Sequence, residues 1–233
     1  MAELYDHIGV GYRDRRRPDP RVAAAISRAL EGADSVVNVG AGAGSYEPAD
    51  RFVVAVEPAM TMIRQRRAGS APVVQAVAAD LPFRDDGFAV ALAILTIHHW
   101  PDKARGLDEL ARVARRRVVV VTWDPSISGF WLADDYFPEI FETDRKIFPT
   151  IEDYRRALGR IDVSPMPIPH DCVDGFLGRV LAAASRLPRR SRARCDLDLC
   201  QAAAPLRRVG SRASSSRPRG RHVGAPPWPS PRP

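Results

Sequence analysis

One segment near the N-terminus, VVNVGAGAG (residues 36–44), joins an apolar run directly to three closely spaced glycines. The apolar run predicts a buried β-strand. Glycine directly after a strand permits a tight turn and lets the backbone approach a ligand closely, because no Cβ is in the way. The segment therefore predicts an α/β fold that holds a ligand at the carboxyl end of this strand.

Strands and helices alternate on both sides of this turn. Apolar runs predict further strands at 52–56, 73–76, 88–95 and 117–122, and helical periodicity predicts helices at 22–30, 59–67, 103–114 and 151–158. Such alternation produces a parallel sheet, because each crossover returns the chain to the same edge. We expect a Rossmann-like, doubly wound, mostly parallel sheet.

The glycine spacing bears on the class of ligand. A dinucleotide-binding turn has the spacing G-x-G-x-x-G, whereas position 45 is a serine here and the third glycine comes one residue early, at Gly44. The segment 44–48 also leaves little room for a long helix facing a pyrophosphate. S-adenosylmethionine (SAM) is therefore favoured over NAD. An NAD-dependent oxidoreductase is the alternative, disfavoured further because no Tyr-x-x-x-Lys arrangement is evident.

Two acidic residues follow the second and third predicted strands. Glu57 ends the second strand, where a carboxylate can accept hydrogen bonds from both hydroxyls of a ribose. Asp80 follows the third strand, where it can accept a hydrogen from the amino group of adenine. The alternatives are a solvated acid at a strand end for Glu57, and the start of a proline-containing turn for Asp80.

Four segments in this order resemble successive motifs of class I SAM-dependent methyltransferases, and most closely the small-molecule enzymes of the ubiquinone/menaquinone-biosynthesis type (methyltransferase type 11). They are the segments 36–44, 53–58, 79–83 and 93–100. The resemblance covers about residues 34–125. It implies the SAM-binding fold and transfer of a methyl group from SAM to a small-molecule acceptor.

The resemblance also assigns residues to parts of the cosubstrate. It places Asn38, Gly40, Gly42 and Gly44 at the methionine moiety, Glu57 at the ribose, Asp80 and Leu81 at the adenine, and Leu95 beside the methyl-transfer site. Asn38 stands where members of the family often carry an acidic residue. The resemblance therefore leaves open how the methionine amino group is held.

Catalysis of methyl transfer depends mainly on positioning, because a sulfonium needs the in-line approach of a nucleophile more than a strong acid. His98, just past the fourth predicted strand, is the candidate catalytic base for an acceptor hydroxyl. Alternatively, His98 or His99 shapes the pocket. Tyr12 and the basic cluster 15–17 could close over the cosubstrate as a lid, or form a solvated arm.

The positive charge is concentrated at the C-terminus. The net charge is +7, yet thirteen arginines and two aspartates after Gly178 give that part +11, which leaves −4 for the residues before it. Basic residues indicate a nucleic-acid interface when they lie on one folded face. We therefore do not expect the domain to bind nucleic acid, and binding through the basic tail is kept as an alternative.

Composition also limits the kind of site and the location. The three cysteines lack the paired spacing of a zinc site, and His170, Cys172 and Asp174 form one short cluster, so we expect no metal. The N-terminus has no apolar signal segment and no apolar run is of membrane-spanning length, from which we expect a cytoplasmic protein. Only two of the 35 basic residues are lysines, which is typical of GC-rich bacteria.

The chain divides into an N-terminal arm and helix (1–34), a SAM-binding core (35–178) and an Arg/Pro-rich tail (179–233). The tail has too little apolar surface to offset the entropy of ordering it. It offers no evident seventh strand, so we expect an incomplete C-terminal edge and, as an alternative function, an inactive SAM-binding remnant. The abrupt change after Gly178 is what a reading-frame shift in GC-rich DNA generates.

Overall fold

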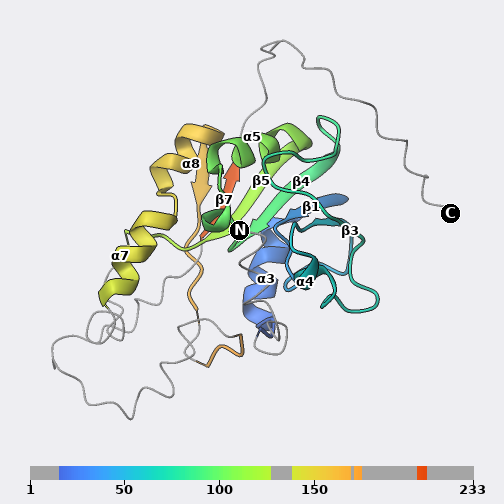
Figure 1. Ribbon diagram of the computed structural model, residues 1–233, viewed down its shortest axis with the longest axis horizontal. Coiled ribbons are helices and arrows are strands. Elements are labelled where there is room, and N and C mark those ends of the chain that lie inside the picture. The colour runs from blue at the N-terminus through green and yellow to red at the C-terminus, as the bar shows by residue number, and fades with distance from the viewer. Residues whose placement is uncertain (1–15, 127–137, 169–170, 175–203, 209–233) are drawn as a thin grey trace.

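The computed structural model describes residues 16–126, 138–168, 171–174 and 204–208. Within these ranges, seven strands form one sheet in the order β3-β2-β1-β4-β5-β7-β6 (Figure 1). They are β1 (Ser35–Val39), β2 (Phe52–Val56), β3 (Val73–Val74), β4 (Phe88–Ile94), β5 (Ala114–Thr122), β6 (Ile161–Val163) and β7 (Ala204–Arg208). The predicted Rossmann-like α/β fold is confirmed.

The described helices are α3 (Pro20–Ala29), α4 (Met60–Ile63), α5 (Lys103–Val113), α7 (Pro138–Ile147) and α8 (Ile151–Leu158), and a 3-10 turn, η1, spans Ile97–His99. Three of them, α3, α5 and α8, begin at a capping side chain. Asp19 accepts the N–H of Arg21 at the start of α3, and Pro20 occupies the first position, where its missing N–H costs nothing. Thr150 and Asp153 cap each other at the start of α8.

Each face of the sheet has its own apolar core, because side chains alternate along a strand. Val37 of β1 packs in one core with Leu107 and Leu110 of α5. Val36 packs in the other core with Ile26 of α3. Helices cover both faces of the central strands, which is why these strands read as continuous apolar runs.

The carboxyl ends of the central strands meet at one edge of the sheet. Strand β1 pairs in parallel with β2 on one side and with β4 on the other, with Asn38 opposite Ala55 and Leu92. Strand β5 continues in parallel beside β4. This register brings the residues that follow β1, β2 and β4 together at the edge where open α/β sheets bind ligands.

The predicted incomplete edge is wrong. Strand β7 lies antiparallel between β5 and β6, with Pro205 opposite Val121. The strand escaped prediction because 204–208 contains no β-branched or aromatic residue, and because proline lacks the N–H that an inner strand donates. Part of the tail thus belongs to the sheet. Its remaining residues, 179–203 and 209–233, lie outside the described residues.

Two other elements are shorter than expected. The helix predicted at 59–67 ends at Ile63 as α4, and the strand predicted at 73–76 is reduced to β3 at Val73–Val74. The connection from β1 to β2 is a turn without a helix, in agreement with the little room that the segment 44–48 leaves. Among the helices of the described ranges, none has the length and apolar character needed to cross a membrane.

Candidate functional site

The turn after β1 has a shape that only glycine permits at its first position. Gly40 has φ +73°, and a Cβ placed on it would lie 2.0 Å from Oγ1 of Thr96. The N–H groups of Gly40 and Ala41 both donate to the carbonyl of Val56, at 2.9 Å each. Gly42 and Gly44 also have positive φ, +55° and +89°. The backbone therefore folds tightly across the end of β2.

Glu57 lies at the centre of this turn. Its carboxylate is buried, and Oε2 accepts the N–H of Gly42 at 2.8 Å while Oε1 accepts the N–H of Ala59 at 2.9 Å. A carboxylate can accept about four hydrogen bonds, so these two are compatible with a role at a ribose. The structure thus brings Glu57, at the end of β2, into contact with the glycine turn.

A buried ion pair supports the turn from the outside. Nη2 of Arg66 lies 2.7 Å from Oε2 of Glu47, and the two side chains are only 5% and 7% exposed. Arg66 also donates to the carbonyls of Gly42, at 3.3 Å, and Ala71, at 3.0 Å. This inward turn of Arg66 follows the early end of α4. Sequence reasoning missed the pair, because no periodic pattern links residues 47 and 66.

Asn38 lies behind the turn with one polar atom unsatisfied. Its Nδ2 donates to Glu47 at 3.3 Å, while Oδ1 is buried and accepts no hydrogen bond from the described part of the chain. Asn38 lines a small hollow of about 50 Å³ together with Gly40, Gly42 and Leu95. A buried acceptor without a donor is uncommon in proteins. Its place in the hollow is suited to a ligand that supplies the donor.

The end of β4 contributes a strained residue to the same hollow. Leu95 has φ +48°, and its N–H donates to the carbonyl of Val121 at 2.7 Å. A bulky residue rarely adopts this conformation, and such strain is concentrated at functional sites. Gly44 lies on the other side of the turn, where it lines a separate hollow beside α3.

His98 follows Leu95 on the turn η1. Its ring stacks on Phe148, with centroids 4.0 Å apart, and lies 3.8 Å from the ring of His99. Burial, with smaller contributions from His99 and Lys103, lowers the pKa of His98 to about 3. A histidine with this pKa is a weak base at neutral pH. The burial of His98 and its stacking on Phe148 therefore favour the alternative to a catalytic base, an uncharged side chain that shapes this end of β4.

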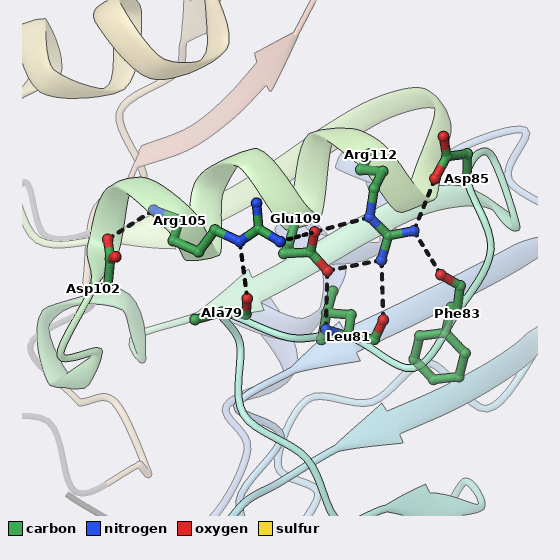
Figure 2. Close-up of polar contacts among 8 residues, drawn as sticks. All are labelled: Ala79, Leu81, Phe83, Asp85, Asp102, Arg105, Glu109 and Arg112. Carbon is green, nitrogen blue, oxygen red and sulfur yellow. Dashed lines mark hydrogen bonds and ion pairs between the residues drawn. The ribbon is translucent and has the colours of Figure 1, made fainter. Parts of the chain in front are cut away.

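The loop that carries Asp80 and Leu81 is held by helix α5 (Figure 2). Oε2 of Glu109 accepts the N–H of Leu81 at 2.9 Å. Arg112 donates to the carbonyls of Leu81, at 3.0 Å, and Phe83, at 2.6 Å. Leu81 is buried and Asp80 is exposed. One helix face therefore fixes the backbone on both sides of Leu81.

Glu109 and Arg112 also form an ion pair with each other, at 2.7 Å. Burial alone would raise the pKa of Glu109, but the hydrogen bonds from Arg112 and from the N–H of Leu81 hold it below its usual range. The pair is one helical turn apart, a spacing visible in the sequence. What the sequence does not reveal is that the pair faces the loop 79–85 rather than solvent.

The segment considered either as a lid or as a solvated arm lies partly within the described residues. Arg16 lines the small hollow, whereas Tyr12 and Arg15 lie outside the described residues. Of the cluster considered for a metal, Cys172 is buried and Asp174 pairs with Arg16, whereas His170 lies outside the described residues. Within the part of the chain described, no group of three or more His, Cys, Asp or Glu side chains could hold a metal ion.

Two comparisons with known sequences bear on the class of this protein. Residues 37–122 match a family described as "Methyltransferase domain". The rice (Oryza sativa subsp. japonica) protein 2-methyl-6-phytyl-1,4-hydroquinone methyltransferase 2, chloroplastic, is 29% identical over 167 residues, which are 66% of this chain and 45% of the rice protein. The chain thus spans less than half the length of that relative.

Solved structures share the whole fold. A protein of Anabaena variabilis described as a methyltransferase from an antibiotic biosynthesis pathway has a TM-score of 0.68 and 22% identity, covering 84% of this chain and 99% of its own. A SAM-dependent methyltransferase of Thermotoga maritima has a TM-score of 0.62 and 19% identity, and the match covers 89% of this chain and 98% of its own. The [4+2]-cyclase SpnF has a TM-score of 0.57 and 14% identity, and the match covers 89% of this chain and 94% of its own. The chain thus has the fold of the class I SAM-dependent methyltransferases, and its residues 37–122 match a methyltransferase domain.

Proposed function

We propose that this protein transfers a methyl group from SAM to a small-molecule acceptor. The observation that carries the proposal is the hydrogen bond between the glycine turn and the buried carboxylate of Glu57, at the edge of the sheet where β1 and β2 end. A turn without a following helix suits a cosubstrate that has no pyrophosphate. The cyclase among the structural neighbours is a reason to test the activity, since a fold alone does not define the reaction.

In this proposal the hollow behind the turn receives the methionine end of SAM. Gly40 and Gly42 allow the ligand to approach the backbone closely, and Oδ1 of Asn38 accepts a hydrogen bond from the methionine ammonium group. Glu57 binds the ribose hydroxyls. Gly44 supports the turn from the opposite side.

The adenine end of SAM is assigned to the loop after β3. Asp80 is exposed and accepts a hydrogen bond from the adenine amino group, while the buried Leu81 packs against the adenine ring. This assignment is supported by the bonds from Glu109 and Arg112, which hold the loop in one conformation. A loop fixed in advance binds a ligand with a smaller loss of conformational entropy.

The acceptor lies, in this proposal, at the end of β4 beside Leu95 and His98. The rings of Phe148, His98 and His99 contact one another in a cluster against which a further aromatic ring can pack. The name of the rice relative, a hydroquinone methyltransferase, agrees with an aromatic acceptor. With His98 uncharged, the rate enhancement comes mainly from orienting the acceptor in line with the methyl group.

The other functions considered have less support. The inactive remnant was suggested by a missing strand, and β7 now occupies that position. An NAD-dependent oxidoreductase has neither the glycine spacing nor a helix after the turn in its favour. The folded unit in this proposal comprises the described parts of residues 16–174 together with β7, and helix α3 belongs to its core.

Calorimetric titration of the full-length protein with S-adenosylhomocysteine tests the proposal. We expect micromolar binding that Glu57→Ala weakens by about tenfold or more, because hydrogen bonds to charged groups contribute about 1.5–3 kcal/mol. Glu139→Ala, which removes an exposed glutamate from α7, is the matched control and should leave the affinity unchanged. Absence of binding by protein with a native circular dichroism spectrum would overturn the proposal.

If the ligand binds, the acceptor is sought by transfer of a labelled methyl group from SAM to phenols and hydroquinones. A labelled product that carries the methyl group on the ring or on its hydroxyl supports the aromatic acceptor. Transfer only to non-aromatic amines or thiols rejects the aromatic acceptor and retains the methyltransferase activity.

A further inference from the structure

The hollow that receives the methionine end in the proposed function contains one charged side chain. It is lined by backbone of the glycine turn, by uncharged side chains and by Arg16, which precedes α3. The N–H groups of Gly40, Ala41, Gly42 and Gly44 donate within the chain. These four N–H groups are therefore engaged, and Arg16 is the lining residue with a permanent positive charge to offer a carboxylate that enters the hollow.

Arg16 is held at the turn by a buried carboxylate that lies 158 residues later in the chain. Its Nε lies 2.6 Å from Oδ1 of Asp174, and its Nη2 donates to Oδ2 of Asp174 at 3.0 Å. The side chain of Arg16 is 18% exposed and that of Asp174 is fully buried. A two-point contact of this kind fixes the plane of the guanidinium as well as its position.

The glycine turn itself takes part in this arrangement through Tyr46. The hydroxyl of Tyr46 donates to Oδ2 of Asp174 at 2.7 Å and accepts the N–H of Asp19 at 3.1 Å. The carboxylate of Asp19 in turn accepts the N–H of Val173 at 3.1 Å. Hydrogen bonds thus join three separate segments, around residues 16–19, 46 and 173–174, on one side of the hollow.

We propose that Arg16 binds the carboxylate of the methionine moiety of SAM, and that Asp174 and Tyr46 are positioning residues that orient its guanidinium. The inference rests on the proposed function. A guanidinium has five N–H donors in a planar fork, so one cation can bond to Asp174 and to a ligand carboxylate at the same time. Together with Oδ1 of Asn38, which takes the ammonium, the hollow then matches both charges of an amino acid.

The test compares two ligands that differ only at the methionine end. S-adenosylhomocysteine carries the amino-acid carboxylate, whereas 5′-methylthioadenosine has the same adenosine and sulfur without it. We expect Arg16→Gln to weaken binding of S-adenosylhomocysteine by about 10- to 100-fold and to leave 5′-methylthioadenosine within about twofold. Arg28→Gln removes the same charge from an exposed position in the last turn of α3 and should change neither affinity.

The positioning residues have their own variants. Asp174→Asn and Tyr46→Phe should each weaken the binding of S-adenosylhomocysteine by about three- to tenfold, again without a change in the affinity for 5′-methylthioadenosine. Arg16→Lys, which keeps the charge and loses the fork, should fall between wild type and Arg16→Gln and serves if Arg16→Gln does not fold. Equal weakening of both ligands, or of neither, overturns the inference. Wild-type protein that binds neither ligand overturns the proposed function instead.

Discussion

The two ends of the proposed SAM site are built differently. At the methionine end the backbone carries the shape, since Gly40 leaves no room for a Cβ beside Thr96. At the adenine end the loop 79–85 has ordinary residues, and the side chains of Glu109 and Arg112 hold its N–H and carbonyl groups (Figure 2). The methionine end is shaped by a glycine that has no Cβ, and the adenine end by hydrogen bonds from helix α5.

This difference predicts how each end responds to substitution. A steric restriction is removed only by moving the backbone, so a single added carbon should have a large effect. Hydrogen bonds from a helix can be lost one at a time, so the adenine end should weaken in steps.

Gly40→Ala should have the largest effect. The left-handed backbone costs a residue with a Cβ about 1–2 kcal/mol, and the overlap with Thr96 adds about 1–3 kcal/mol. Gly69→Ala is the matched control, because Gly69 has φ +84° with nothing within 4 Å of its added Cβ. Urea unfolding should show that Gly40→Ala lowers the free energy of unfolding by more than Gly69→Ala does. Equal losses would mean that Thr96 moves away without cost.

Glu109→Gln should have an intermediate effect at the other end. It removes the charge that pairs with Arg112 and weakens the acceptor for the N–H of Leu81, for a loss of about 1–3 kcal/mol of stability. The affinities for adenosine and for S-adenosylhomocysteine should both fall, by the same factor, since the change lies at the adenine end. Asp108→Asn, on the exposed face of the same helix, is the control. A loss confined to S-adenosylhomocysteine would contradict the assignment of this loop.

His98 should give the smallest effect, and one that depends on pH. Its pKa is lowered from 6.5 to about 3, so the unfolded chain binds a proton that the folded protein excludes. The contribution of His98 to stability is therefore complete above about pH 6.5 and is lost as the pH falls toward 3. Thermal unfolding of wild type and His98→Gln should differ most at pH 7, with a gap that narrows toward pH 4. A gap that widens on acidification would mean that His98 is charged in the folded protein.

Most of the sheet could be predicted from the sequence, because its central strands are buried on both faces. Strands β1, β2, β4 and β5 are continuous apolar runs, and such runs have few other interpretations when helices alternate with them. Strand β7 could not be predicted in this way. Its place depends on the open edge of β5 rather than on its own composition, and its proline argued against a central strand.

The candidate site was predictable only where function restricts residue type locally. The glycines and Glu57 stand next to strands, so their positions follow from the strands themselves. The ion pairs around the site do not follow from the strands, because Glu47 meets Arg66 and Arg16 meets Asp174 only after the chain has folded. Ion pairs between distant segments have no periodicity in the sequence, and a charged residue alone is more often solvated.

The position of β7 has a consequence for the order in which a ribosome delivers this chain. Strands β1 to β5 are complete once residue 122 has been made, yet the antiparallel partner of β5 is made last, at residues 204–208. During synthesis of the intervening 81 residues, the N–H and carbonyl groups on that side of β5 have no strand beside them. A nascent chain that stalls before residue 204 would present this edge to other nascent chains, and cross-linking of stalled complexes should find it there.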